Sequence, residues 1–164
     1  MTTGRESDEW LMGQVQRGNH ACLEKLLRRY ASPLLTFIVR MIGDRHRSEE
    51  LFQEVFLRIW QKRGQYKLNH TFRSWLYTIA ANHCRADFRR PVPPVASADL
   101  AGVPSTDSSP AHTAMATETR TIVETAIAQL PPPQRTVVVL RVWNGLKYAE
   151  IAEITGSNEN TVRS

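Results

Sequence analysis

Residues 49–63 have the sequence EELFQEVFLRIWQKR, in which apolar side chains recur at intervals of three and four. That spacing is the period of an α-helix, whereas a half-buried strand would alternate apolar and polar residues. The apolar set covers more of the helix circumference than a single core-facing stripe requires; it comprises Leu51, Phe52, Val55, Phe56, Ile59 and Trp60. A central place in a helical bundle and a docking surface for a partner protein would both produce this pattern.

Helical spacing continues on both sides of this segment, and no strand pattern is evident. Capping residues, glycines and prolines predict where each helix begins and ends. The predicted starts are Ser7, Ser32-Pro33, Ser48 and Thr71, and the pair Gly18-Asn19 is predicted to interrupt the first helix. Short connections and complementary apolar faces predict a compact bundle for residues 7–90.

Residues 91–113 differ in kind, because they are rich in Pro, Gly, Ala, Ser and Thr and contain no Lys or Arg. Such a composition is typical of a flexible linker. Helical spacing returns within residues 122–130, 134–143 and 147–154, and a last helix is predicted from Asn158. The sequence therefore predicts an all-α protein with two small helical domains, residues 7–90 and 114–164, which the linker would allow to lie apart on one extended partner.

The formal net charge of +5 is unevenly distributed. Residues 1–95 carry 16 Lys and Arg against 9 Asp and Glu, whereas residues 96–164 carry 5 against 7. A basic first half favours a polyanionic partner, most commonly nucleic acid, although a solvated basic surface would also account for it.

Several other classes of protein are disfavoured by the sequence. There is no apolar run long enough to span a membrane, no secretory signal, and only two well-separated cysteines, so we expect a cytoplasmic protein. Phosphate-binding glycine loops, His-Glu-x-x-His and Cys-x-x-Cys are absent, and no catalytic constellation stands out. We therefore expect a binding protein that is not an enzyme and has no cofactor or metal.

Residues 148–164 are spaced like a helix-turn-helix. Ala152 is small where two helices must cross closely, and Gly156 suits a turn with positive φ. Polar residues then open the second helix, at the end that meets base edges and phosphates in a major groove; they are Asn158, Asn160, Thr161 and Arg163. An ordinary helical hairpin remains the alternative.

The predicted helix 71–90 places four arginines alongside Trp75 and Tyr77. Arginines can follow a phosphate backbone while aromatic rings stack on unpaired bases, a combination suited to single-stranded DNA. The alternative, which we favour for Trp75, buries the aromatic rings in the core and leaves the arginines in water.

Three motifs in this order resemble the extracytoplasmic-function (group 4) sigma factors of the sigma-70 family. Residues 50–60 resemble the polymerase-binding helix of region two, residues 72–82 resemble the adjacent element that melts and reads the −10 promoter element, and the motifs between Leu130 and Ser164 resemble region four, which reads the −35 element. The resemblance implies a subunit that binds core RNA polymerase through its β′ clamp helices and β flap, directs it to promoter DNA, and is held in check by an anti-sigma factor.

The resemblance also implies roles for individual residues. Those similar to the family's contacts with the clamp helices are Glu50, Gln53, Glu54 and Phe56. Those that fall where the family handles the −10 strand are Asn69, His70, Arg73, Asn82, Arg85, Arg89 and Arg90. Those at the start of the −35 recognition helix are Asn158, Asn160, Thr161 and Arg163.

Two departures from the family pattern affect these expectations. The acid that usually follows the position of Asn82 by four residues is replaced by Ala86, and its neighbour Asp87 is acidic instead. Family members also continue through a basic stretch beyond the position of Ser164, so we expect the chain to end within region four and its −35 binding to be weak or absent. A stand-alone helix-turn-helix regulator and a helical sigma mimic that does not touch DNA remain alternatives.

Overall fold

The computed structural model describes residues 6–91 and 110–164, and for residues 110–115 it describes the backbone only. All regular elements in these ranges are helical, in agreement with the predicted all-α class. They are α1 (Asp8–Gln16), α2 (His20–Ile42), α3 (Arg45–Lys62), the 3₁₀ turn η1 (Arg63–Gln65), α4 (Phe72–Phe88), α5 (Pro110–Ala128), α6 (Pro132–Val142), α7 (Tyr148–Thr155) and α8 (Glu159–Arg163). Within the described ranges, every helix is too short or too polar to cross a lipid bilayer.

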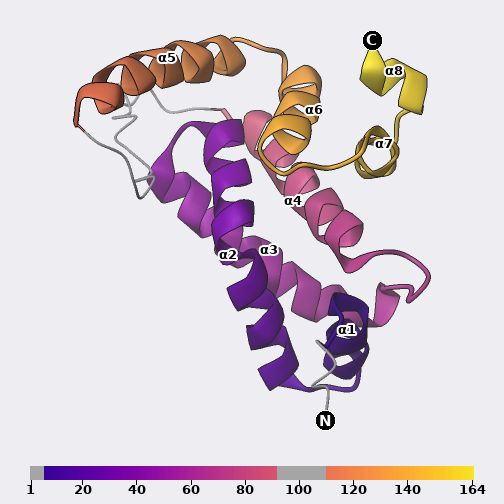
Figure 1. Ribbon diagram of the computed structural model, residues 1–164. Coiled ribbons are helices and arrows are strands. Elements are labelled where there is room, and N and C mark those ends of the chain that lie inside the picture. The colour runs from indigo at the N-terminus through magenta and orange to yellow at the C-terminus, as the bar shows by residue number, and fades with distance from the viewer. Residues whose placement is uncertain (1–5, 92–109) are drawn as a thin grey trace.

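Helices α1 to α4 form the first bundle (Figure 1). Two predicted caps are confirmed, because the side chains of Ser7 and Thr71 each accept a hydrogen bond from a backbone N–H in the first turn of α1 and α4. Asn19, which follows the predicted interruption, caps α2 in the same way. The apolar faces of these helices meet in a common core that includes Leu26 and Phe37, both fully buried. Both cysteines also lie in this core as free thiols, with Cys22 5% and Cys84 0% exposed.

The predicted helix start at Ser32-Pro33 is wrong, because α2 runs without interruption from His20 to Ile42. Pro33 has no N–H to donate to the carbonyl of Arg29, so the helix forgoes one hydrogen bond there. Leu26 and Leu34, on either side of the proline, are both fully buried in the same core. Packing of one continuous apolar face therefore overrides the local signal of the proline.

Replacing Pro33 with alanine should raise the free energy of unfolding by about 1–2 kcal/mol, because it restores the N–H and removes an unfavourable residue from a helix interior. Urea denaturation followed by circular dichroism measures the change. Pro132→Ala is the matched control: Pro132 is the first residue of α6, where an N–H has no partner within the helix. Equal effects of the two substitutions would contradict this account of α2.

The start of α3 also differs from the prediction. Asp44 is the N-cap, and its Oδ1 accepts from the backbone N–H of Arg47 at 2.7 Å. Ser48, the predicted start, is fully buried, and its hydroxyl donates to the carbonyl of Asp44 at 2.5 Å. Both residues are good caps by type, and the position of the buried face decides between them.

Helices α5 to α8 form the second part of the molecule, and α5 begins at Pro110, inside the range predicted as linker. The remainder of that range, residues 92–109, lies outside the described residues. The second part packs on the first, with α6 against α2 and α7 against α4 (Figure 1). Arg135 of α6 fixes this junction, since it donates to the carbonyls of Met41 at 2.6 Å and Leu130 at 3.1 Å.

Candidate polymerase and nucleic-acid interface

The exposed side of α3 carries most of the predicted polymerase contacts. Glu50 and Gln53 are exposed and Glu54 is half-buried. Phe56 differs, because it is only 6% exposed and its ring packs 5.2 Å from that of Phe52. The structure therefore places Phe56 in the core, where it supports the exposed side of the helix from beneath.

Leu57, which the sequence analysis did not single out, lies on the same exposed side and is 57% exposed. It is one turn beyond Gln53, so the two side chains are neighbours on the helix surface. The unusually wide apolar circumference of residues 49–63 was the signal that could have identified it. We call Glu50, Gln53 and Leu57 the α3 face.

Arg47 connects this face to α4. Its guanidinium donates to Glu50 at 2.9 Å, to Glu54 at 3.1 Å and to Asp87 of α4 at 2.7 Å. The hydrogen bond from Arg47 lowers the pKa of Glu50. Asp87 is the acid whose position departs from the family pattern, and the structure shows that it joins α4 to α3.

The C-terminal half of α4 presents an exposed basic surface. Asn82, Arg85, Arg89 and Arg90 are all exposed. Arg85 donates to Asn82 at 3.2 Å, which holds both side chains on one side of the helix. We call these four residues the α4 basic surface; the guanidinium groups of its three arginines are accessible to a phosphate backbone.

Trp75 and Tyr77 of α4 pack into the bundle, as the alternative interpretation of this helix predicts. Tyr77 is 2% exposed, and Trp75 is partly buried with its ring centroid 5.1 Å from that of Tyr66. The expectation that Trp75 packs into the bundle is therefore supported. In this arrangement Tyr77 does not offer a face on which a base could stack.

The N-terminal end of α4 is covered by α7. Arg73 Nη2 donates to both carboxylate oxygens of Glu150, at 2.8 and 2.9 Å. In the loop before α4, His70 Nδ1 lies 2.8 Å from Glu153 Oε1, while Asn69 is exposed. Two of the three predicted −10 residues in this region are thus paired with acids of the second part of the chain.

The carboxyl of Glu150 is ionised in this pair. Burial alone would raise the pKa of Glu150, but hydrogen bonds from the Lys147 backbone N–H and from Arg73 lower it overall. A carboxyl whose pKa falls on folding stabilises the fold above its ordinary pKa, and that contribution is lost as the pH falls through the lowered value. The charge of Glu150 therefore makes its full contribution to the contact between α4 and α7 at neutral pH.

Helices α7 and α8 have the predicted helix-turn-helix geometry. Gly156 has φ 66°, in the left-handed region that the turn needs. The Asn158 side chain caps α8 by accepting from the N–H of Asn160 at 2.9 Å. All four predicted −35 residues are exposed, and they are Asn158, Asn160, Thr161 and Arg163.

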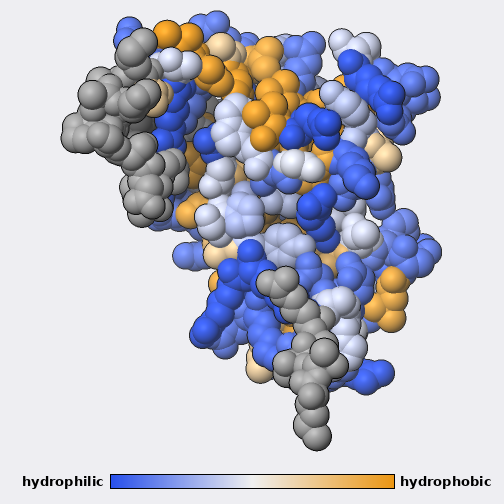
Figure 2. All heavy atoms as spheres, viewed as in Figure 1, coloured by the Kyte–Doolittle hydropathy of each residue, from blue (hydrophilic) through white to orange (hydrophobic). Residues whose placement is uncertain are grey.

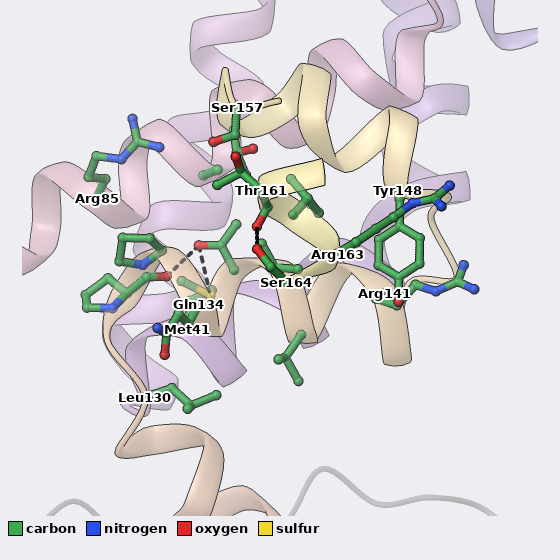
Figure 3. A pocket seen from close by; sticks show the side chains of 18 of the residues that line it. Met41, Arg85, Leu130, Gln134, Arg141, Tyr148, Ser157, Thr161, Arg163 and Ser164 are labelled. Atoms are coloured by element: carbon green, nitrogen blue, oxygen red, sulfur yellow. Dashed lines mark hydrogen bonds between the residues drawn. The ribbon is translucent and has the colours of Figure 1, made fainter. Parts of the chain in front are cut away.

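An open groove of about 1240 Å³ lies between α4 and the helices α6 to α8 (Figure 3). Its lining includes apolar side chains such as Leu130 and Val137 together with Arg85, Arg141 and Arg163. Arg141 and Arg163 both lie over the ring of Tyr148, at 4.7 and 5.4 Å from its centroid. On the face shown in Figure 2, hydrophobic surface gathers over α5 and α6, where Ile122 and Val142 are more than 60% exposed.

Family models match both parts of the chain. The model described as Sigma-70 region 2 matches residues 26–91, and the model described as Sigma-70, region 4 matches residues 120–164. Among solved structures, CnrH in complex with the cytosolic domain of CnrY has a TM-score of 0.72 at 21% identity, covering 95% of this chain and 87% of that one. The sigma factor RpoE of Bartonella quintana, in complex with the anti-sigma factor NepR, has a TM-score of 0.64 at 19% identity, with coverages of 85% and 86%. These two structures show the same helical fold.

Curated relatives extend the match over almost the whole chain. RNA polymerase sigma-H factor of Pseudomonas aeruginosa is 32% identical over 170 residues, covering 98% of this chain and 88% of the relative. The ECF RNA polymerase sigma-E factor of Escherichia coli K12 is 30% identical over 172 residues, with coverages of 96% and 87%. SigW of Bacillus subtilis, also an ECF sigma factor, is 27% identical over 161 residues, with coverages of 92% and 86%. The chain therefore belongs to the extracytoplasmic-function sigma factors of the sigma-70 family, which direct RNA polymerase to promoters.

Proposed function

We propose that this sigma factor binds core polymerase through the α3 face, with Glu54 at its edge, and that this face meets the β′ clamp helices. The observation that carries the proposal is the exposure of Glu50 and Gln53 next to an open basic surface on α4. Had these side chains been sealed in the core, neither polymerase nor DNA could reach them. Residues 114–164 add a second contact, to the β flap.

The −10 element is handled by residues 7–90. The α4 basic surface supplies cations for the phosphates of the non-template strand, and Asn69, His70 and Arg73 act at the opposite end of α4. Extracting one base from the duplex costs a few kcal/mol, which phosphate contacts and polymerase binding together offset. The protein contributes binding and positioning, and the chemistry of RNA synthesis belongs to the polymerase.

We propose that residues 114–164, which residues 91–113 join to the first domain, face the −35 element, with the weak affinity expected from the sequence. Thr161 and Arg163 offer polar groups at the exposed end of the helix-turn-helix. Asn158 uses its Oδ1 as a cap, so its Nδ2 is the group that would meet DNA. Asn160 is the fourth exposed polar residue proposed to meet the −35 element.

We also propose that an anti-sigma factor is a partner of this chain in the cytoplasm. In the two solved structures described above, RpoE is in complex with the anti-sigma factor NepR, and CnrH is in complex with the cytosolic domain of CnrY. The two alternative functions, a stand-alone regulator and a sigma mimic, are not favoured by the comparisons, because the matched relatives are sigma factors over nearly their full length.

Transcription with purified components tests the function directly. Core polymerase should start transcripts at defined sites on fragmented genomic DNA of the source organism only when this chain is added, and sequencing of transcript 5′ ends maps those sites. A chain that ignores polymerase but protects a palindromic duplex alone would instead be a stand-alone regulator. A chain that binds polymerase without directing any start site would be a mimic.

A further inference from the structure

Trp10, near the start of α1, exposes an aromatic ring to solvent. Its exposed fraction is 49%, and among the Trp, Phe and Tyr residues in the described ranges it is the one that is neither buried nor half-buried. An exposed ring of this size forgoes the favourable free energy that its burial would give. Single exposed apolar residues are common on protein surfaces, so the neighbours of Trp10 decide whether the ring has a binding role.

The first turn of α1 lies at the start of α4, beside the loop that carries candidate −10 residues (Figure 1). Glu9 Oε1 accepts from the backbone N–H of Phe72, the first residue of α4, at 3.2 Å. At the other end of α1, Gln16 donates through Nε2 to the carbonyl of Tyr66 at 2.8 Å. The Tyr66 hydroxyl in turn donates to the carbonyl of His70 at 2.5 Å. Helix α1 and the loop before α4 are therefore held together as one unit.

Leu68, in this loop, adds a second exposed apolar side chain. It is 60% exposed and lies over Gly13 of α1, where a β-carbon would be 3.8 Å from Leu68 Cδ2. Gly13 is three residues after Trp10, so the two positions are neighbours on the helix surface. Leu68 also stands between Lys67 and Asn69, which are both exposed. A ring and a cation thus occur on the same unit, a combination that binds single-stranded nucleic acids.

Two acidic residues that precede Trp10 have cationic partners. Glu6 pairs with Lys25 at 2.7 Å, and Asp8 pairs with Arg29 at 2.7 Å. A carboxylate matched by a cation repels a nearby phosphate less than a lone carboxylate would. These pairs therefore leave the ring accessible to a DNA strand, and what the ring itself offers is a flat apolar face rather than charge.

Helix α4 lacks an exposed ring of its own. Tyr77 is 2% exposed, and Trp75 is partly buried beside Tyr66. The cations of the α4 basic surface are nevertheless open, and sites for single-stranded DNA combine such cations with rings on which bases stack. Trp10 can supply from α1 the ring that α4 does not present.

We propose that Trp10 stacks on an unpaired base of the promoter strand that α4 holds, with Leu68 at the edge of the stack. In duplex DNA the faces of each base are covered by its neighbours, so Trp10 favours opened over paired DNA. Every base has a face that can stack, so the contact tolerates any sequence. The inference rests on the proposed role of residues 7–90 at the −10 element, and it adds a base-binding residue outside α4 and its loop.

Binding of the isolated chain to a short single-stranded DNA of mixed sequence tests the proposal, because Trp10 is exposed without any partner present. Fluorescence anisotropy across a salt series measures the affinity. Trp10→Ala should weaken binding by about five- to tenfold, the lower part of the range for one stacked base. The slope of log affinity against log salt should not change, because no phosphate contact is lost. Wild type and variant should bind a strand of abasic sugars equally well.

Two further variants at the same position separate stacking from general apolar contact. Trp10→Phe retains a ring and should keep most of the affinity, whereas Trp10→Leu retains apolar surface without a ring and should bind like Trp10→Ala. All three should unfold at the wild-type urea concentration, since the side chain is exposed. If the wild type does not bind the strand, or if Trp10→Ala or Trp10→Leu binds it as tightly as the wild type, the stack is wrong.

Tryptophan fluorescence supplies a second readout. The ring of Trp60 is stacked on His20 at 3.9 Å between centroids and has Arg63 at 4.0 Å, so it is already covered by protein groups. A base that stacks on Trp10 should quench part of the emission of the wild type. Trp10→Phe should bind the strand without that quenching, and equal quenching in both proteins would place the base elsewhere and contradict the proposal.

These measurements are independent of the transcription test of the proposed function. A chain that directs transcription while Trp10→Ala binds the single strand with full affinity refutes only the stack. If Trp10→Ala loses affinity as expected but the wild-type chain never directs a transcription start, Trp10 binds single strands and the sigma function is refuted.

Discussion

Replacing both Gln53 and Leu57 of the α3 face with arginine should weaken binding to core RNA polymerase by at least about 30-fold. Central positions in a protein interface commonly contribute 2 kcal/mol or more, which corresponds to that factor. Leu57 is 57% exposed in the free chain and Gln53 lies one turn before it. The substitutions would place two charges where apolar and uncharged surface meets the partner.

Because both side chains face solvent, the variant should unfold at the same urea concentration as the wild type. The matched control is Trp10→Arg with Gln65→Arg, two exposed positions in α1 and η1, outside both proposed polymerase contacts. Surface plasmon resonance with immobilised core polymerase measures both affinities. Retained binding by the Gln53 and Leu57 variant would remove α3 from the proposed interface.

Charge reversal of Glu54 would be a less direct test of the same surface. Glu54 accepts from Arg47 at 3.1 Å and lies 3.4 Å from His83 Nδ1. Arginine at this position would face Arg47 and disturb the link between α3 and α4. Lost binding in that variant would therefore mix an interface effect with a structural one.

Replacing Arg89 and Arg90 with alanine should weaken promoter opening by about tenfold at low salt and reduce its dependence on salt. Hydrogen bonds to charged groups contribute about 1.5 kcal/mol or more each, and part of this is recovered by water when an exposed arginine is lost. Each phosphate contact on a single strand adds roughly 0.7 to the slope of log affinity against log salt. The slope should therefore fall by about 1.4.

Both arginines are exposed at the end of α4, and neither takes part in the contact with α7. Their loss thus tests DNA contact while the bonds of Arg73 and His70 to α7 remain in place. Lys25→Ala with Arg28→Ala removes two exposed charges from α2 and is the control. Permanganate footprinting of the polymerase complex across a salt series gives both values, and equal slopes for the two variants would show that the arginines do not touch DNA.

Much of the fold could be predicted because its signals are local. Ser7, Asn19 and Thr71 are caps within one turn of the groups they satisfy. Glycine is the residue type that takes a left-handed turn without strain, so Gly156 could be assigned to the turn from the sequence. The start of α3 and the continuity of α2 could not be predicted this way, because buried faces decide them against equally good local alternatives.

The candidate site likewise contains residues that local patterns identify and contacts that they do not. Gln53 and the arginines Arg85, Arg89 and Arg90 of α4 were identified as polar positions from residue type and spacing, and they are exposed. Arg73 was identified in the same way, but it is partly buried against Glu150. The bond from Arg47 to Asp87 joins positions 40 apart, and that from Arg73 to Glu150 joins positions 77 apart. No spacing rule connects residues so far apart in the sequence. Such pairs become evident only when the arrangement of the helices in space is known.

The buried cysteines have a practical consequence for labelling the protein with dyes. Cys84 is fully enclosed, and desolvation by burial raises the pKa of its thiol to about 12, so almost no thiolate exists at neutral pH. Cys22 is similarly enclosed at 5% exposure. Maleimide dyes should therefore react with cysteines introduced at surface positions and spare the native pair, which makes single-molecule energy transfer between the two parts accessible in an otherwise unaltered background.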